Sequence, residues 1–142
     1  MSTLSAAISA SASALTVERT RIEVAVSNIA NAESTRGPDG QPYRRRDVLL
    51  ASDPIGSFDA VLGQVSASGV KVAGIVQDQT PFRRRYEPSH PDADADGFVL
   101  LPNVDTSEEM VDMLGAARAY QANLAAIGLI KDMVAKALEL GR

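Results

Sequence analysis

The sequence predicts an α+β fold in which long N- and C-terminal helices form a coiled-coil-like pair, with a small mostly-β middle domain. Three observations predict it. In the first thirty residues, apolar side chains recur every seven positions: Met1, Ile8, Leu15, Ile22 and Ile29. Near the C-terminus they alternate every three and four positions, interrupted only by Lys131: Met110, Met113, Ala117, Tyr120, Leu124, Ile127, Val134 and Leu138. Residues 36–104 instead carry short apolar runs separated by Gly and Pro. The predicted boundaries are therefore 1–35, 36–104 and 105–142.

The N-terminal arm predicts one helix over residues 3–33. Ser2 or Thr3 can cap its start, and the turn sequence Gly37-Pro38-Asp39-Gly40 ends it. A helix of about 30 residues is about 45 Å long, at about 1.5 Å per residue. Such a helix is longer than a small domain needs.

The middle region predicts short strands at Tyr43–Ala51, Val70–Gln77 and Gly97–Leu101. Phe58–Val65 is compatible with either a strand or a short helix. We expect a small antiparallel sheet or a partial barrel.

The C-terminal arm predicts a second long helix over residues 106–140. Thr106 and Glu109 have the spacing of a capping box, in which each side chain bonds a backbone amide of the first turn. Gly141 is a candidate for the glycine that follows a helix end.

Composition excludes several classes of function. The net charge of −4 argues against a general nucleic-acid binder. The absence of cysteine excludes disulfides, thiolate metal sites and thiol nucleophiles. No catalytic fingerprint is present, so we expect no enzyme activity and no cofactor. The first thirty residues lack the charged start and apolar run of a cleavable signal peptide, and no stretch predicts a membrane-spanning helix.

Two local motifs are weak candidates for ligand binding. Asp92–Gly97 begins like a calcium-binding loop, but the twelfth loop position is Asn103 and Pro102 blocks an exiting helix. A solvated acidic turn is the better interpretation, and His90 alone cannot anchor a usual zinc site. We therefore predict no metal site.

Two arginine triplets, at 44–46 and 83–85, are a second possible binding feature. Each could bind phosphate, but alternate residues of a strand point to opposite faces, which would divide each triplet. Salt bridges with acidic neighbours in an assembly, or an exposed strand face, are better interpretations.

The apolar stripes predict an assembly surface. They could simply be a core face of a two-helix hairpin. That pairing would still leave apolar area exposed, because further apolar residues widen the stripes: Ala25, Val26, Leu114, Ala125, Leu129 and Ala137. The residues predicted to pack between subunits are Ile8, Leu15, Ile22, Val26, Ile29, Met110, Met113, Tyr120, Leu124, Ile127, Val134 and Leu138.

Several motifs resemble the flagellar basal-body rod proteins, and their proximal rod subunits in particular. They occur in order along nearly the whole chain, except at about residues 51–68. They include Ser27-Asn28-Ile29-Ala30-Asn31, a Gly-Pro-Asp-Gly-Gln-Pro-Tyr element at 37–43, and Ala119-Tyr120-Gln121-Ala122-Asn123. The positions that carry the resemblance are Asn28, Asn31, Gly37, Pro38, Gly40, Tyr43, Pro102, Asn103, Asp105, Gln121 and Asn123.

The resemblance implies a structural role. Rod proteins pair their terminal helices into an inner tube and carry a small β-rich domain outside it. It implies export by the flagellar type III apparatus, stacking with copies of itself and other rod proteins across the periplasm, proximity to inner-membrane ring components, and torque transmission. It implies no nucleic-acid partner and no direct insertion into a membrane.

Alternatives remain open at the level of sequence. The chain could be another axial protein of the same family, or a soluble binding module whose arms dimerise. Asn28 and Asn31 either specify the register between subunits or only begin the end of the helix. We also expect both arms to be poorly ordered in the free chain, because neither can bury its stripe alone.

Overall fold

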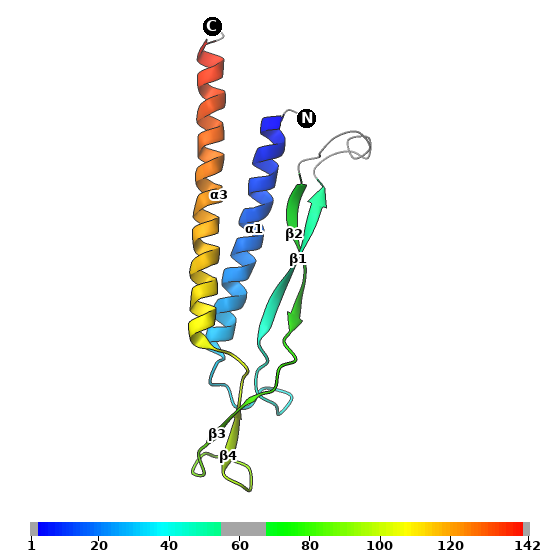
Figure 1. The fold of residues 1–142 in the computed structure, drawn as a ribbon, viewed down its shortest axis with the longest axis vertical. Coiled ribbons are helices and arrows are strands. Elements are labelled where there is room, and N and C mark those ends of the chain that lie inside the picture. The colour runs from blue at the N-terminus through cyan, green and yellow to red at the C-terminus, as the bar shows by residue number, and fades with distance from the viewer. Residues whose placement is uncertain (1–2, 55–67, 141–142) are drawn as a thin grey trace. The chain divides into compact units, whose positions relative to one another are not determined.

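The structure is a computed structural model that describes residues 3–54 and 68–140. It confirms the α+β fold, with two long helices and a middle region of short strands (Figure 1). The elements are α1 (Thr3–Ala30), β1 (Arg46–Pro54), β2 (Ser68–Gln77), β3 (Arg83–Tyr86), β4 (Phe98–Leu101) and α3 (Thr106–Leu140). Met1, Ser2, Gly141 and the ambiguous segment Phe58–Val65 lie outside the described residues.

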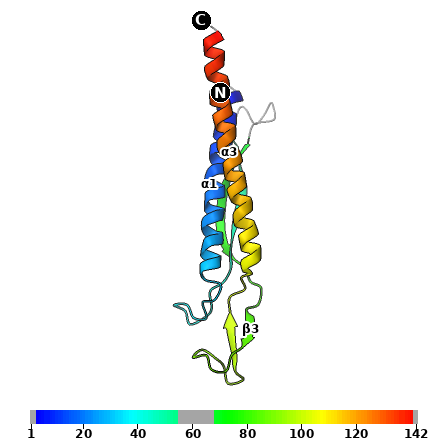
Figure 2. The same ribbon diagram turned by 90° about the vertical axis from the view of Figure 1, so that its left-hand side faces the viewer.

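Both helices are long and unbroken, as Figure 2 shows. Helix α1 has 28 residues and α3 has 35. Helix α1 ends at Ala30, three residues before the predicted end, where the amide of Ala32 turns back to the carbonyl of Ile29. The strongest periodic segments therefore have the predicted type and nearly the predicted length.

The strands form two separate two-stranded sheets rather than one sheet or a partial barrel. Strand β1 pairs with β2, and β3 pairs antiparallel with β4. The sequence did not predict β3, because three consecutive arginines give no apolar alternation. Its pairing with the apolar β4 supplies the strand partner that the local sequence cannot indicate.

The chain divides by its internal contacts into two compact units. The arm unit comprises Met1–Thr20, Leu49–Gly74 and Gly115–Arg142, and the clamp unit comprises Arg21–Val48 and Ile75–Leu114. Each helix contributes a segment to both units. The predicted domain boundaries at 35/36 and 104/105 stay a prediction.

The clamp unit holds most of the buried apolar side chains. Register places Arg83 opposite Leu101 and Arg85 opposite Val99, so these four residues share one face of the β3–β4 sheet. Val99 and Leu101 are buried on that face, and Val104 follows them into the interior. In the arm unit, Val17 and Ala116 are the buried apolar residues among those that the structure describes.

The start of α3 differs from the predicted capping box. Asp105, not Thr106, caps the helix, because its carboxylate accepts hydrogen bonds from the amides of Ser107 (2.8 Å) and Glu108 (3.4 Å). These two bonds lower the pKa of Asp105. Glu109 does not bond back to the cap with its side chain, which is engaged elsewhere.

We predict that Asp105→Ala destabilises the protein at neutral pH. A carboxyl whose pKa is lowered by folding stabilises the folded state above its ordinary pKa and loses that contribution as pH falls through the folded pKa. The difference in unfolding free energy between variant and native chain should therefore shrink as acid denaturation begins below about pH 4. Urea unfolding across pH checks this, and a difference independent of pH would contradict it.

We predict that Gly97→Ala destabilises the protein more than Gly40→Ala. Both glycines have positive φ, 79° and 72°, which costs alanine about 1–2 kcal/mol. At Gly97 an added Cβ would also lie 2.9 Å from Cε2 of Tyr86 and 3.2 Å from Cβ of Pro88, whereas at Gly40 nothing lies within 4 Å. Overpacking of that kind adds about 1–3 kcal/mol. Equal losses in urea unfolding would show that the contact with Tyr86 relaxes freely.

Candidate assembly interface and its polar clamp

A single buried side chain, Asn28, joins three segments of the clamp unit. Its Nδ2 donates to the carbonyl of Arg46 (2.8 Å) and to Oε2 of Glu109 (2.9 Å). Its Oδ1 accepts from the hydroxyl of Tyr43 (2.8 Å) and the amide of Arg46 (3.0 Å). Asn28 is 0% exposed, and these four bonds use the full capacity of its carboxamide. We call this arrangement the clamp.

Glu109 extends the clamp from the first turns of α3. The side chain is 2% exposed, and its second oxygen lies 2.5 Å from Nε of Arg45. Arg45 also approaches Asp112 (3.6 Å) and Asp47 (3.9 Å). Burial acts to lower the pKa of Arg45, but the bond and charge of Glu109, with the two aspartates, raise it overall. The buried carboxylate is thus both paired and hydrogen-bonded, as a buried charge must be.

Asn103 fixes the chain on the other side of Arg45. Its Oδ1 accepts the amide of Arg45 (2.9 Å), and its Nδ2 donates to Oγ1 of Thr80 (2.7 Å). The amide of Asp78 then bonds the carbonyl of Arg45 (2.9 Å). The residue before β1 is therefore held at its backbone by Asn103 and at its guanidinium by Glu109.

The structure brings some of the motif residues together and leaves others apart. Asn28 and Tyr43 contact each other directly, while Asn103 reaches them through Arg45. Pro102 is buried beside Asn103 in sequence, and Asp105 caps α3. The motif residues of the 37–40 turn, Gly37, Pro38 and Gly40, precede Tyr43.

The remaining asparagines and the glutamine of the motif set act locally or stay exposed. Nδ2 of Asn31 donates to the carbonyl of Ser27 (2.8 Å), one turn back. Asn123 does the same to Ala119 (2.9 Å), and Gln121 is exposed on α3. In the described chain, Asn28 therefore has a long-range intramolecular role, while Asn31 satisfies the end of its own helix.

None of the twelve residues predicted to pack between subunits is buried in the single chain. Seven are half-buried, and an eighth lies near that limit. The most exposed are Val26 (49%), Met110 (53%), Leu124 (54%) and Leu138 (70%). The half-buried members of the set are Ile8, Leu15, Ile22, Ile29, Met113, Tyr120 and Ile127, and Val134 is 36% exposed.

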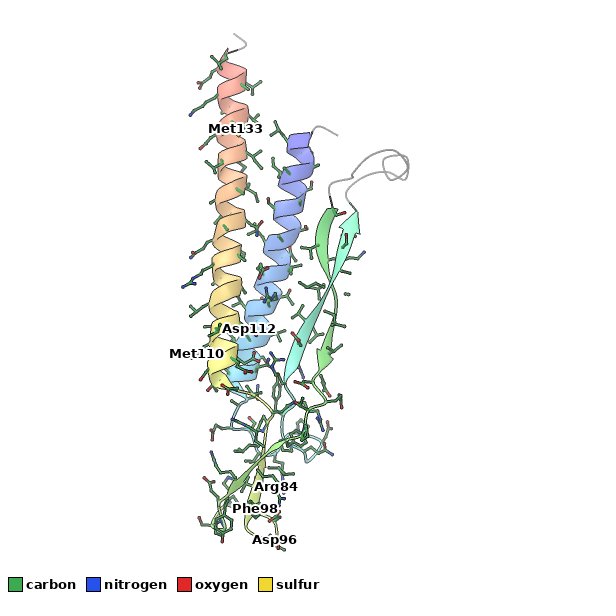
Figure 3. All side chains as sticks on the ribbon, viewed as in Figure 1. Arg84, Asp96, Phe98, Met110, Asp112 and Met133 are labelled. Carbon is green, nitrogen blue, oxygen red and sulfur yellow. The ribbon has the colours of Figure 1, made fainter. Side chains whose placement is uncertain are left out.

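Helix α3 exposes further apolar side chains beyond that set. Leu129 and Met133 are 65% and 61% exposed in the arm unit, and Val111 is 69% exposed in the clamp unit. Figure 3 shows Met110 near the start of α3 and Met133 toward its other end. Exposed apolar side chains of this size are candidates for an interaction surface.

Both arginine triplets are largely engaged within the clamp unit. Arg84 stacks over Phe98 (4.5 Å), and Figure 3 shows these two residues together on the β3–β4 sheet. Arg84 also approaches Asp94 (3.6 Å). Arg85 binds Glu33 and Glu87. Arg44 stacks over Phe82 (4.3 Å) and Arg46 over Tyr43 (5.5 Å).

The aspartate-rich loop at residues 92–97 uses its carboxylates for contacts within the chain. Asp92 accepts from Thr35 (2.8 Å) and pairs with Arg36 (3.1 Å), while Asp94 accepts the amides of Asp96 and Phe98. Among the described residues, no cluster of His, Cys, Asp or Glu could hold a metal ion. No helix within the described ranges is long and apolar enough to cross a membrane.

Comparison with known proteins identifies the family. A protein of Salmonella typhimurium named flagellar basal-body rod protein FlgC is 46% identical over 130 residues, which is 92% of each chain. The chain belongs to the FlgC family of flagellar basal-body rod proteins. Proteins of the same name from Bacillus subtilis and Agrobacterium fabrum are 44% and 40% identical, and cover 95% and 99% of this chain.

A second comparison concerns the C-terminal part alone. Residues 95–140 match the family described as the C-terminal region of the flagellar basal body rod FlgEFG proteins. That range contains β4, the Asp105 cap, Glu109 and all of α3. Membership of the FlgC family confirms the resemblance that the sequence motifs predicted.

Sequence reasoning missed the pairing of Glu109 with Asn28 and Arg45. Glu109 was assigned to the capping box, because its spacing from Thr106 is that of the motif. One signal was present: Asn28 interrupts the apolar side of a helix, where a polar side chain requires a partner. The sequence does not say which of the later polar residues supplies it.

We predict that Asn28→Ala destabilises the clamp unit by about 2–4 kcal/mol, because Glu109, Tyr43 and the amide of Arg46 each lose a buried partner. The matched control is Asn123→Ala, whose amide only bonds its own helix, with an effect within about 0.5 kcal/mol. Urea unfolding of both purified variants measures the difference. Equal effects would mean that the buried network contributes no net stability.

Proposed function

We propose that this chain is a structural subunit of the proximal rod of the bacterial flagellar basal body. It polymerises through its terminal helices into an axial drive shaft that transmits torque. The observation that carries the proposal is the series of exposed apolar side chains along α3, on a chain 40–46% identical to proteins named for the rod. Neighbouring subunits would cover these side chains.

The physical basis of assembly is burial of these faces. Removing apolar surface from water contributes about 25 cal/mol per Å². When α1 and α3 of one subunit contact different surfaces of the next subunit, the contact is heterologous. If the rotation that relates successive subunits does not close into a ring, the subunits form a helical rod. The twelve packing residues are proposed to form these contacts. Subunit packing of this kind calls for no catalytic group and no cofactor.

The proposed partners are other copies of this chain and other rod proteins, with inner-membrane ring components at the base. We propose that the subunit reaches the periplasmic rod through the flagellar type III export apparatus, without a cleaved signal peptide. The arm segments of both helices are poorly ordered before assembly in this account, since half-exposed helices gain little stability alone. Assembly then supplies the burial that orders them.

Deletion of the gene in its native host tests the proposed function. We expect basal bodies without a rod in electron micrographs, and motility restored by the intact chain. Complete rods and normal swimming in the deletion strain would contradict the proposal. A discrete symmetric dimer of the purified chain in light scattering, with fully helical arms, would instead favour a dimerising binding module.

We predict that Leu138→Asp blocks rod assembly without destabilising the free subunit. The side chain is 70% exposed, so a charge costs the monomer little, but in a covered apolar interface it would be desolvated without a partner. Lys136→Asp, a charge change at another exposed position of α3, is the control and should leave swimming intact. Swimming assays measure both. Normal motility of Leu138→Asp would remove this residue from the interface.

A further inference from the structure

A cavity of about 390 Å³ in the clamp unit is lined by three arginines. They are Arg36, Arg44 and Arg46, and the loop from Gly37 to Tyr43 forms much of the remaining wall. Asp39 is the acidic residue in the lining. We call this cavity the arginine pocket.

Two of these arginines, Arg44 and Arg46, form no close ion pair with a carboxylate in the described part of the chain, although the charge of Arg44 helps to lower the pKa of Asp78. Arg44 stacks over Phe82 and reaches the carbonyls of Asp78 and Thr80 at 3.4 Å. The guanidinium of Arg46 lies over Tyr43, while its backbone, not its side chain, bonds Asn28. Stacking fixes the planes of both groups and leaves N–H donors available at their edges. An acidic ligand would therefore meet preorganised donors.

The same unit also exposes a surface of opposite charge. The first turns of α3 carry an open cavity of about 480 Å³ lined by Ser107, Glu108, Val111 and Asp112. Glu108 is exposed and has no ion-pair partner among the described residues. Val111 is 69% exposed, and the side chain of Asp112 is 55% exposed. We call this surface the acidic turn.

We propose that the arginine pocket of one subunit receives the acidic turn of a second copy of this chain. The proposal rests on the proposed function and adds a contact outside the apolar faces of the helices. Glu108 supplies a carboxylate that can pair directly with Arg44 and Arg46, in the planar geometry that guanidinium groups bind best. Val111 supplies the apolar area that is buried with it.

A second copy is favoured as the occupant for two reasons. The pocket and the acidic turn are different patches of one chain, so their contact is heterologous and continues from copy to copy, as a rod requires. Charge complementarity is the second reason, because an electropositive pocket favours a surface with exposed carboxylates, and the acidic turn carries Glu108 and Asp112.

Cysteine cross-linking tests the contact, because the chain contains no cysteine of its own. Gln41→Cys at the pocket and Val111→Cys at the acidic turn are placed in one chain, which replaces the native subunit in its host. Isolated basal bodies are treated with a short bis-maleimide. We expect a ladder of multimers of this chain, and only monomer from either single-cysteine variant.

Charge changes then test the electrostatic part. In the double-cysteine chain, Arg46→Glu or Glu108→Arg should abolish the ladder, and the two together should restore it. Arg84→Gln, an exposed arginine outside the pocket, is the control and should leave the ladder unchanged. Failure of the paired changes to restore the ladder would overturn the role assigned to Arg46 and Glu108.

The outcomes separate the contact from the proposed function. If basal bodies contain the double-cysteine chain but show no ladder, or show it cross-linked to a different protein, the second-copy contact is wrong and the rod assignment stands. If the unsubstituted chain is absent from isolated basal bodies, the proposed function itself fails. If the double-cysteine chain fails to enter basal bodies although the unsubstituted chain enters them, the swimming of strains that carry Arg46→Glu or Glu108→Arg in the cysteine-free chain tests the contact. Normal swimming of both strains would overturn it.

Discussion

The buried carboxamide of Asn28 is the constraint on which the clamp unit depends. It bonds the end of the connection into β1 through the backbone of Arg46, and it bonds α3 through Glu109. A buried amide with four partners is stable in only one arrangement, since each unmade bond leaves a polar group without water or partner. The segment after α1 and the first turns of α3 are thereby fixed to each other by one side chain.

The two units use different physical means. The clamp unit combines the buried apolar residues of β4 and the segment after it with a fully bonded polar network, in which Arg45 balances the charge of Glu109. The arm unit buries Val17 and Ala116 but exposes Leu124, Leu129 and Leu138. Polar networks specify one geometry and are complete within a chain, whereas an exposed apolar face gains free energy only from a neighbour. This contrast between the two units supports a subunit whose clamp unit is stabilised within the chain and whose exposed apolar side chains in the arm unit are covered on assembly.

Sequence reasoning was strongest where the pattern is long and local. The seven-residue repeat and the three-four alternation predicted both helices, and the Gly-Pro-Asp-Gly turn placed the end of α1 to within a few residues. The β1–β2 and β4 strands were predicted from apolar runs. Strand β3 was missed, because Arg83–Tyr86 become a strand only through pairing with β4.

The clamp could not be predicted for a related reason. Asn28 and Glu109 are 81 positions apart, and nothing in either local sequence points to the other. Glu109 has the spacing of a capping box, and a local rule assigned it there. The cap at Asp105 left its side chain free for the interior, where tertiary contacts decide its partner. Residues such as Asn28 and Asn103, which bond segments far apart in sequence, could be predicted only as motif positions, and their bonding partners could not be predicted.

The most direct test of this account is hydrogen–deuterium exchange on the free, purified subunit. The account predicts slow exchange for the amides of Arg45 and Arg46, which bond Asn103 and Asn28, and for the first turns of α3 beside Glu109. It predicts fast exchange along residues 115–140, because this part of α3 lacks the neighbouring subunits that would order it. Protection along 115–140 as strong as that of residues 106–114 would contradict the claim that the clamp unit folds alone and assembly orders the arms.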